Sequence, residues 1–201
     1  MKTTRRTAIF VGLLFLVSTV TFMIGSNLIQ SFLIDVSQNK STLILGVVLE
    51  IICGLAVVGI GVLMFPILKL FNKRLALGYI IFRAIECTTI IIGGIYLLSL
   101  LTYMWKYEMI IFVFTAVGGL ILSYLLYISK LIPRYLSVLG IIGYSMLFLR
   151  VVFDIFSIFH ISETVGMLIY IPGGLFELFL PIWLFIKGFN SSAIASVKEN
   201  V

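Results

Sequence analysis

Residues 43–65 read LILGVVLEIICGLAVVGIGVLMF and contain a single charged residue, Glu50. An α-helix needs about 20 apolar residues to cross the hydrocarbon core of a membrane, so this run predicts a transmembrane helix. A carboxylate near the bilayer centre is disfavoured by about 3 kcal/mol on insertion scales. We therefore expect Glu50 to face the protein interior and to be sheltered, paired or protonated there.

Five further runs have the same apolar character, and they cover residues 8–28, 75–101, 109–129, 135–159 and 166–187. Hydrophobic residues make up 62% of the chain and charged residues 11%, which excludes a soluble domain of this length. The sequence therefore predicts an all-α integral membrane bundle of six transmembrane helices. We expect one domain over residues 1–190 and a short polar cytoplasmic tail over residues 191–201. Because no A-x-A-like cleavage site follows the first run, we expect an uncleaved first span.

Lysine and arginine predict the orientation, because short cytoplasmic loops carry an excess of them. One side of the predicted bundle carries Lys2, Arg5, Arg6, Lys69, Lys73, Arg74, Lys130, Arg134, Lys187 and Lys198, and the other carries only Lys40 and Lys106. Both termini are therefore predicted to be cytoplasmic. This asymmetry also explains the net charge of +6 without nucleic acid as a partner. The aromatic group Tyr103, Trp105 and Tyr107 is expected at the outer membrane interface.

Charged residues within the predicted spans form two local pairs. Arg83 and Glu86 are three residues apart and Arg150 and Asp154 four apart, so each pair lies on one helix face. This pairing leaves an acidic surplus, because Glu50 and Glu177 have no arginine at such a spacing. The predicted binding site in the bundle core comprises Glu50, Arg83, Glu86, Arg150, Asp154 and Glu177. Hydroxyl groups expected at similar depths belong to Thr88, Thr89, Tyr96, Tyr144 and Tyr170.

Glu177 lies between helix-breaking residues. Pro172 and two glycines precede it and Pro181 follows it, so the last span is predicted to be kinked or locally unwound, with freed carbonyls near the carboxylate. In the second span, small residues share a face with Glu50 and predict close helix packing. Those residues are Gly46, Cys53, Gly54, Val57 and Gly61.

Several kinds of chemistry have no support in the sequence. His160, expected at the outer mouth, is the only histidine, which excludes a tri-histidine zinc site, and no glycine-rich phosphate loop or C-x-x-C motif is present. We therefore expect no metal and no cofactor. Cys53 and Cys87 fall inside predicted spans, so they are expected to be packing residues and not a disulfide.

Three groups of residues resemble a known family. They are FPILK at 65–69 with LALGY at 75–79 and FRAIE at 82–86, then LIPRYLS at 131–137, and Glu177 with WLFIKGF at 183–189. This pattern resembles the signature of a bacterial multi-span membrane family known as a domain of unknown function, DUF4386. The resemblance implies a multi-pass protein of the bacterial plasma membrane. It implies recurring polar positions at Glu50, Arg83, Glu86 and Glu177, and it brings no known activity.

Three functions fit these residues. The first is a proton- or cation-responsive site that serves transport of small solutes or ions, or membrane sensing; Glu177 and Glu50 would titrate, with Glu86 as partner and Arg83 as fixed counter-charge. The second is an intramembrane enzyme that acts on a lipid through a buried glutamate base. The third is a non-catalytic structural or immunity-type partner whose acids lock the bundle. We favour the first over an enzyme. The core ligand could be a small molecule, an ion or a lipid, and a homo-oligomer is left open.

Overall fold

The computed structural model describes residues 2–34, 39–100, 105–156 and 163–198, and within these ranges it contains seven α-helices and no strand. The helices are α1 (Lys2–Ile34), α2 (Lys40–Leu68), α3 (Lys73–Leu100), α4 (Trp105–Ser129), α5 (Arg134–Phe156), α6 (Glu163–Ile186) and α7 (Ser191–Lys198). The first six correspond to the six predicted spans, which confirms the all-α bundle. The helix α1 is longer than predicted at both ends, and α7 lies within the predicted polar tail.

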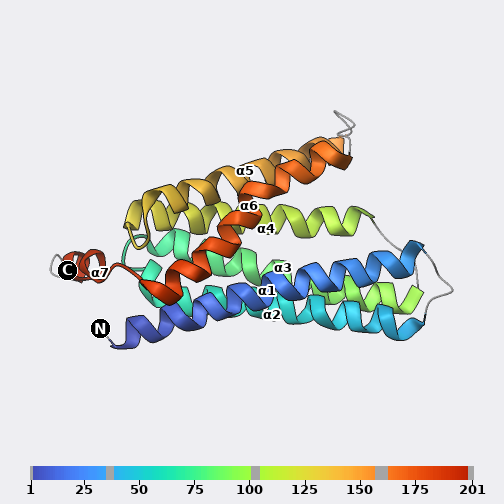
Figure 1. Cartoon of the computed structure of the whole chain (residues 1–201), viewed down its shortest axis with the longest axis horizontal. Helices are drawn as coiled ribbons and strands as arrows, with labels where there is room; N and C mark the ends of the chain where they lie inside the picture. The colour runs from blue at the N-terminus through green and yellow to red at the C-terminus, as the bar shows by residue number, and fades with distance from the viewer. Residues whose placement is uncertain (1, 35–38, 101–104, 157–162, 199–201) are drawn as a thin grey trace.

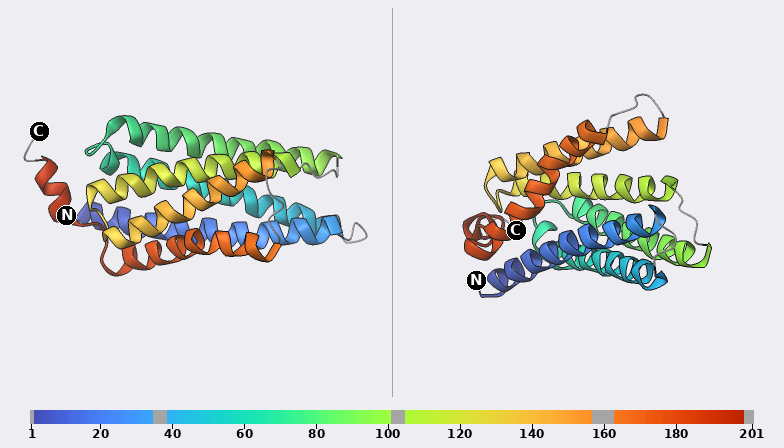
Figure 2. Two further views of the ribbon diagram at one scale, coloured as in Figure 1. Left: turned by 90° about the horizontal axis from the view of Figure 1, so that it is seen from above. Right: turned by 45° about the vertical axis from the view of Figure 1, so that its right-hand side comes forward.

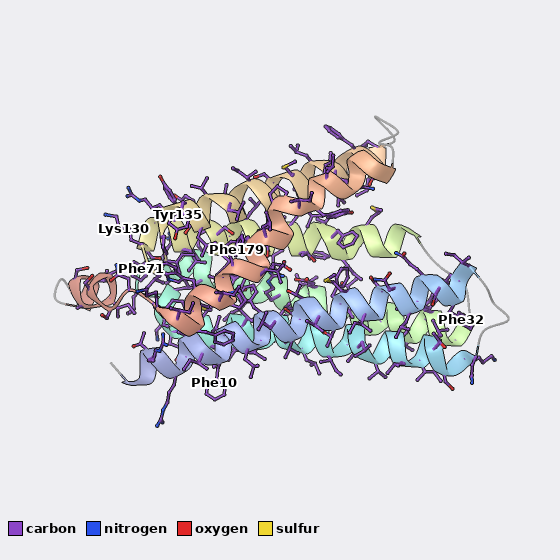
Figure 3. The ribbon with its side chains drawn as sticks, in the orientation of Figure 1. Phe10, Phe32, Phe71, Lys130, Tyr135 and Phe179 are labelled. Atoms are coloured by element: carbon purple, nitrogen blue, oxygen red, sulfur yellow. The ribbon has the colours of Figure 1, made fainter. Side chains whose placement is uncertain are left out.

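Helices α1 to α6 are long and apolar enough to cross a membrane. Their outer surfaces carry large apolar side chains, including Phe10, Ile92 and Phe179, which are about half exposed. Phe10 points away from the bundle in Figure 3. Such a surface would be unfavourable in water but suits contact with lipid chains. The chain is therefore a multi-pass membrane protein.

The six long helices form a closed ring, because each one contacts the next along the chain and α6 contacts α1 (Figures 1 and 2). Both termini lie at the same end of the bundle, on the left in Figure 1. We call this the terminal end and the opposite one the far end. The terminal end carries the α2–α3 and α4–α5 connections with their basic residues, so the predicted cytoplasmic side corresponds to it.

Close helix crossings depend on residues without bulky side chains. Gly143 of α5 meets the backbone of Gly173 of α6 directly, and a Cβ on Gly46 of α2 would lie 3.0 Å from the carbonyl oxygen of Gly25 in α1. Gly54 of α2 lies against Cys87 of α3. The prediction that small residues of the second span serve helix packing is thus confirmed. Cys53 and Cys87 are both buried and not disulfide-bonded.

The ring is tight at the terminal end and wider at the far end. Near the terminal end, the Phe185 ring of α6 contacts Gly12 of α1, and Arg5 Nη1 donates a hydrogen bond to Leu184 O at 3.2 Å. Toward the far end, α5 and α6 together diverge from α1 and α2 (Figure 1 and the right view of Figure 2). Helices α3 and α4 also separate toward the far end, so the ring widens between helices α1 to α3 and helices α4 to α6.

Helix α6 corrects one sequence-based expectation. Pro172 and Pro181 both lie inside a continuous α-helix that runs from Glu163 to Ile186, so the predicted local unwinding is wrong, while the alternative, a kink, stays a prediction. The neighbouring helices explain why the helix persists, because Phe176 and Leu180, which lie between the prolines, are fully buried. The loss of one backbone hydrogen bond per proline is offset by this packing. Pro181 still offers no N–H to the carbonyl of Glu177, four residues earlier.

Candidate functional site

A cavity of about 880 Å³ lies inside the ring, mainly in its far half. Every one of the six long helices contributes a polar side chain to its wall. These residues are Thr19 of α1, Glu50 of α2, Arg83 and Glu86 of α3, Thr115 of α4, Tyr144 and Arg150 of α5, and Glu177 of α6. Its volume is within the range of pockets that hold small molecules.

Glu86 is the centre of one polar group on the cavity wall. Arg83 Nη1 lies 2.6 Å from Glu86 Oε2 in an ion pair, and Thr115 Oγ1 donates a hydrogen bond of 2.7 Å to Glu86 Oε1. Arg83 and Glu86 are only 3% and 4% exposed. The pairing predicted from the three-residue spacing is confirmed. Both oxygens of Glu86 are thus satisfied, one by a cation and one by a neutral hydroxyl.

The Arg83 guanidinium is held by its neighbours. It lies over the Tyr79 ring, 5.3 Å from the ring centroid, and a Cβ added to Gly118 of α4 would come within 3.3 Å of its Nε. Any larger residue at position 118 would therefore push the guanidinium away from α4. Arg83 is a fixed positive charge inside the bundle.

Glu177 is the centre of a second polar group that joins three helices. Tyr144 Oη donates a hydrogen bond of 2.8 Å to Glu177 Oε1, and Thr19 Oγ1 donates one of 3.3 Å to Oε2. Within the described part of the chain, no lysine or arginine forms an ion pair with Glu177. This carboxylate is therefore held by neutral hydroxyls alone, whereas Glu86 has a cation.

The packing of Tyr144 explains how its hydroxyl reaches Glu177. Its ring lies directly against Gly119 of α4, where any side chain would clash, and it makes an edge contact with Phe176, with ring centroids 5.9 Å apart. Tyr144 is almost fully buried. The hydroxyl is thus fixed by apolar packing, and the carboxylate is positioned by it.

Glu50 lies on the cavity wall, and its Cγ packs against Gly25 of α1. It is half-buried, so the expectation that it faces the interior is confirmed. Glu50, Glu86 and Glu177 all line one cavity. They do not, however, form a group of three ligands for one metal ion among the described residues. The three carboxylates thus lie at separate places on the cavity wall.

The Arg150–Asp154 pair reaches the cavity through its arginine only. Arg150 Nε and Asp154 Oδ2 are 3.3 Å apart, as the four-residue spacing predicted, and the guanidinium lies 5.1 Å from the centroid of the Tyr170 ring. Arg150 and Tyr170 line the cavity, whereas Asp154 does not. The predicted site residues therefore share one cavity apart from Asp154, which lies behind Arg150.

The cavity has apolar walls around this polar interior. Phe112 makes ring contacts with Phe22 and with Tyr170, with centroids 6.2 Å apart in both cases. Met23 of α1, which is 59% exposed, and the exposed Gly174 of α6 also belong to the wall. Exposed wall residues also occur on α3, where Ile92 is 62% exposed, and on α4, where Ile110 is 47% exposed, so the cavity reaches the bundle surface at several helices.

The family model for a domain of unknown function, DUF4386, matches residues 10–108 and 103–188. The chain belongs to the DUF4386 family. No curated protein and no solved structure matches it. The family assignment confirms the resemblance seen in the sequence. The four polar positions that the resemblance singled out in this DUF4386 protein, Glu50, Arg83, Glu86 and Glu177, all line the cavity.

Sequence reasoning missed two hydroxyls of the DUF4386 site, Thr19 and Thr115. Each is a polar residue about as deep in its span as the glutamate it contacts, so a comparison of depths could have found both. Thr88 and Thr89, which were expected to contribute, donate instead to the carbonyls of Ala84 and Ile85 in their own helix. His160 and Tyr103 lie outside the described residues, as do the side chains of Trp105 and Tyr107.

Proposed function

We propose that this protein binds a small cationic or proton-bearing solute in the cavity, in the service of transport or sensing across a bacterial plasma membrane. The observation that carries the proposal is the environment of Glu177. Its carboxylate faces a cavity large enough for a small molecule and is held by two hydroxyls and no cation. A cation or a proton that enters the cavity would supply the missing positive charge.

The distribution of charge supports a division of roles. Three carboxylates and two guanidinium groups line the cavity, so the acids exceed the bases. Arg83 is paired with Glu86 and Arg150 with Asp154, and both arginines also lie over tyrosine rings. In this proposal Arg83 is a fixed counter-charge, and Glu177, together with Glu50, responds to the solute.

The aromatic wall favours an organic cation over a bare metal ion. Phe22, Phe112 and Tyr170 form a connected patch of rings in the cavity, and ring faces attract ammonium groups through the cation–π interaction. A substituted ammonium ion of small size would place its charge near a carboxylate and its carbon atoms against these rings. We therefore expect alkylammonium ions to act more strongly than sodium or potassium.

The test compares wild type with Glu177→Gln in reconstituted vesicles. Gradients of protons, sodium and methylammonium are imposed in turn, and a trapped pH dye and a membrane-potential dye record the response. We expect a response from wild type that Glu177→Gln loses while its helical content and melting temperature are retained. The control is Thr88→Val, which removes a hydroxyl outside the cavity wall that donates to Ala84 O in its own helix. A wild type that responds to no gradient, or an unchanged response from Glu177→Gln, would contradict the proposal.

A second function, an intramembrane enzyme that acts on a lipid, is favoured by the lipid-facing residues on the cavity wall, such as Met23 and Ile92. Such an enzyme needs a carboxylate that substrate can reach from the bilayer, and Glu177 with the Tyr144 hydroxyl at 2.8 Å would form an acid–base pair. Incubation of the protein with defined phospholipids, followed by mass spectrometry, distinguishes the two. A lipid product that depends on Glu177 would identify the enzyme, whereas unchanged lipids favour binding.

A further inference from the structure

A second pocket lies at the terminal end, away from the central cavity. It has a volume of about 570 Å³ and is formed where the α4–α5 connection meets the residues that follow α6. Its wall includes Lys130 and Arg134 from the first segment and Trp183, Lys187 and Asn190 from the second. Figure 3 shows Lys130 at this end, beside Tyr135. Two chain segments about 50 residues apart in sequence thus build one basic pocket.

The two segments are fastened together, so the pocket is part of the fold. Asn190 N donates a hydrogen bond of 2.9 Å to Leu131 O, and Asn190 Nδ2 donates one of 3.3 Å to Lys130 O. Lys130 adopts a left-handed conformation with φ of 52°, and Gly188 has φ of 72°. A lysine in this region is uncommon, because a Cβ there is crowded. The backbone is therefore held in a shape that brings the three cations to one place.

The charge of this pocket is entirely positive. Its wall contains three cations and no acidic residue, and none of the three forms an ion pair within the described ranges. The Arg134 guanidinium is oriented by the Tyr127 ring, 5.4 Å from the ring centroid. Helix α5 also begins here: Leu136 and Ser137 donate to Pro133 O, and the earlier N–H groups add the positive end of the helix dipole. The pocket thus has the features of an anion site.

The position of the pocket indicates which kind of anion can reach it. Trp183 on its wall and the exposed Tyr135 beside it are residue types that concentrate at the membrane–water interface. Basic pockets between helices on the cytoplasmic side of membrane proteins suit anionic lipid headgroups. We propose that this pocket binds the phosphate of an anionic phospholipid, whose acyl chains lie against the apolar surface of the bundle. This inference is independent of the function proposed for the central cavity.

The excess of basic residues expected in cytoplasmic loops does not by itself explain why three of them line one pocket. The α2–α3 connection also carries three basic residues, Lys69, Lys73 and Arg74, which are exposed, as are the three cations of the pocket. None of them belongs to the wall of this pocket. The two basic groups lie at the same end of the bundle, and they differ in whether they line this pocket. The α2–α3 group is therefore a matched control of equal charge.

The test measures lipid binding to the purified full chain in neutral detergent. The probes are phosphatidylglycerol and phosphatidylcholine with identical acyl chains, and inorganic phosphate in a separate arm; native mass spectrometry and melting temperature are the readouts. The pocket variant combines Lys130→Gln, Arg134→Gln and Lys187→Gln, and the control variant combines Lys69→Gln, Lys73→Gln and Arg74→Gln. We expect wild type and control to prefer phosphatidylglycerol, and the pocket variant to bind it at least about tenfold more weakly.

Three results would overturn the inference. Equal binding of the two lipids to wild type would show that the phosphate charge is not recognised. Equal losses in the two variants would show general attraction to positive charge. Binding of inorganic phosphate as tight as that of the lipid would make a soluble anion the ligand. If the triple variant fails to fold, Lys187→Gln alone, with Lys73→Gln as its control, provides the same comparison.

Discussion

The buried Arg83–Glu86 pair allows a stability prediction with a defined size. The two side chains are 4% and 5% exposed, so removal of either charge leaves the other in the bundle interior. Arg83 lies roughly 15 Å along α3 from the terminal end, too far for its side chain to reach water there. Breaking a buried pair by removing one partner costs about 3–5 kcal/mol. Because one side of the pair faces a cavity and not packed side chains, we expect the lower value, about 3 kcal/mol, for Glu86→Gln.

The double variant Arg83→Met with Glu86→Leu distinguishes two causes of instability, an unpaired buried charge and altered side-chain packing. It removes both charges together, so it should be within about 1 kcal/mol of wild type and more stable than either single variant. The control is Asp154→Asn, whose pair with Arg150 has side chains 19% and 22% exposed; we expect a cost of about 0.5–1 kcal/mol. Reversible unfolding in mixed micelles, followed by circular dichroism, measures six proteins: wild type, Glu86→Gln, the single variants Arg83→Met and Glu86→Leu, the double variant, and Asp154→Asn. A Glu86→Gln protein as stable as wild type, or a double variant as unstable as the two single variants combined, would refute this reasoning.

Three further predictions concern the packing around the site. Gly143→Ala should lower the free energy of unfolding by about 1–3 kcal/mol, because its Cβ would meet the α6 backbone directly. Gly174→Ala should not lower it, because a Cβ there has no neighbour within 4 Å. Thermal unfolding of the two variants measures the difference. Arg5→Gln should cost about 1 kcal/mol, since Arg5 donates to the last carbonyls of α6, and the exposed Arg6→Gln is its control. Tyr144→Phe should keep the fold, because the ring packing remains. It should alter the response of reconstituted vesicles to the imposed gradients, because the Glu177 carboxylate loses one hydrogen-bond donor. A response identical to that of wild type would argue against this contact.

The six spans and the two ion pairs within helices could be predicted because each depends on spacing along one chain segment. Apolar length gave the spans, and spacings of three and four residues gave Arg83–Glu86 and Arg150–Asp154. The contacts between helices could not be predicted in the same way. A single sequence does not determine how each helix is rotated in the ring. This rotation decides that Thr115 reaches Glu86 in addition to Ile111 O of its own helix, while Thr88 donates to Ala84 O of its own helix.

The predicted unwinding of α6 was wrong for a related reason. Proline and glycine near Glu177 indicated a local break, because proline removes a backbone hydrogen bond. The sequence did not reveal how completely Phe176 and Leu180 would be enclosed, and this burial keeps the helix continuous through both prolines. The Tyr144 hydroxyl was expected at the right depth. Its contact with Glu177 became visible only with the arrangement of α5 on α6.

The charge of the central cavity can be measured most directly with thiol reagents of opposite charge. Ser26 lies on the cavity wall two turns of α1 beyond Thr19, so Ser26→Cys, in a background with Cys53→Ala and Cys87→Ala, places one thiol in the path to Glu177. A cleft with an excess of one sign of charge raises the local concentration of ions of the opposite sign. We predict that a cationic thiosulfonate reacts faster than an anionic one of similar size, and that Glu177→Gln lowers this ratio. Equal rates for the two reagents, or a ratio unaffected by Glu177→Gln, would contradict it.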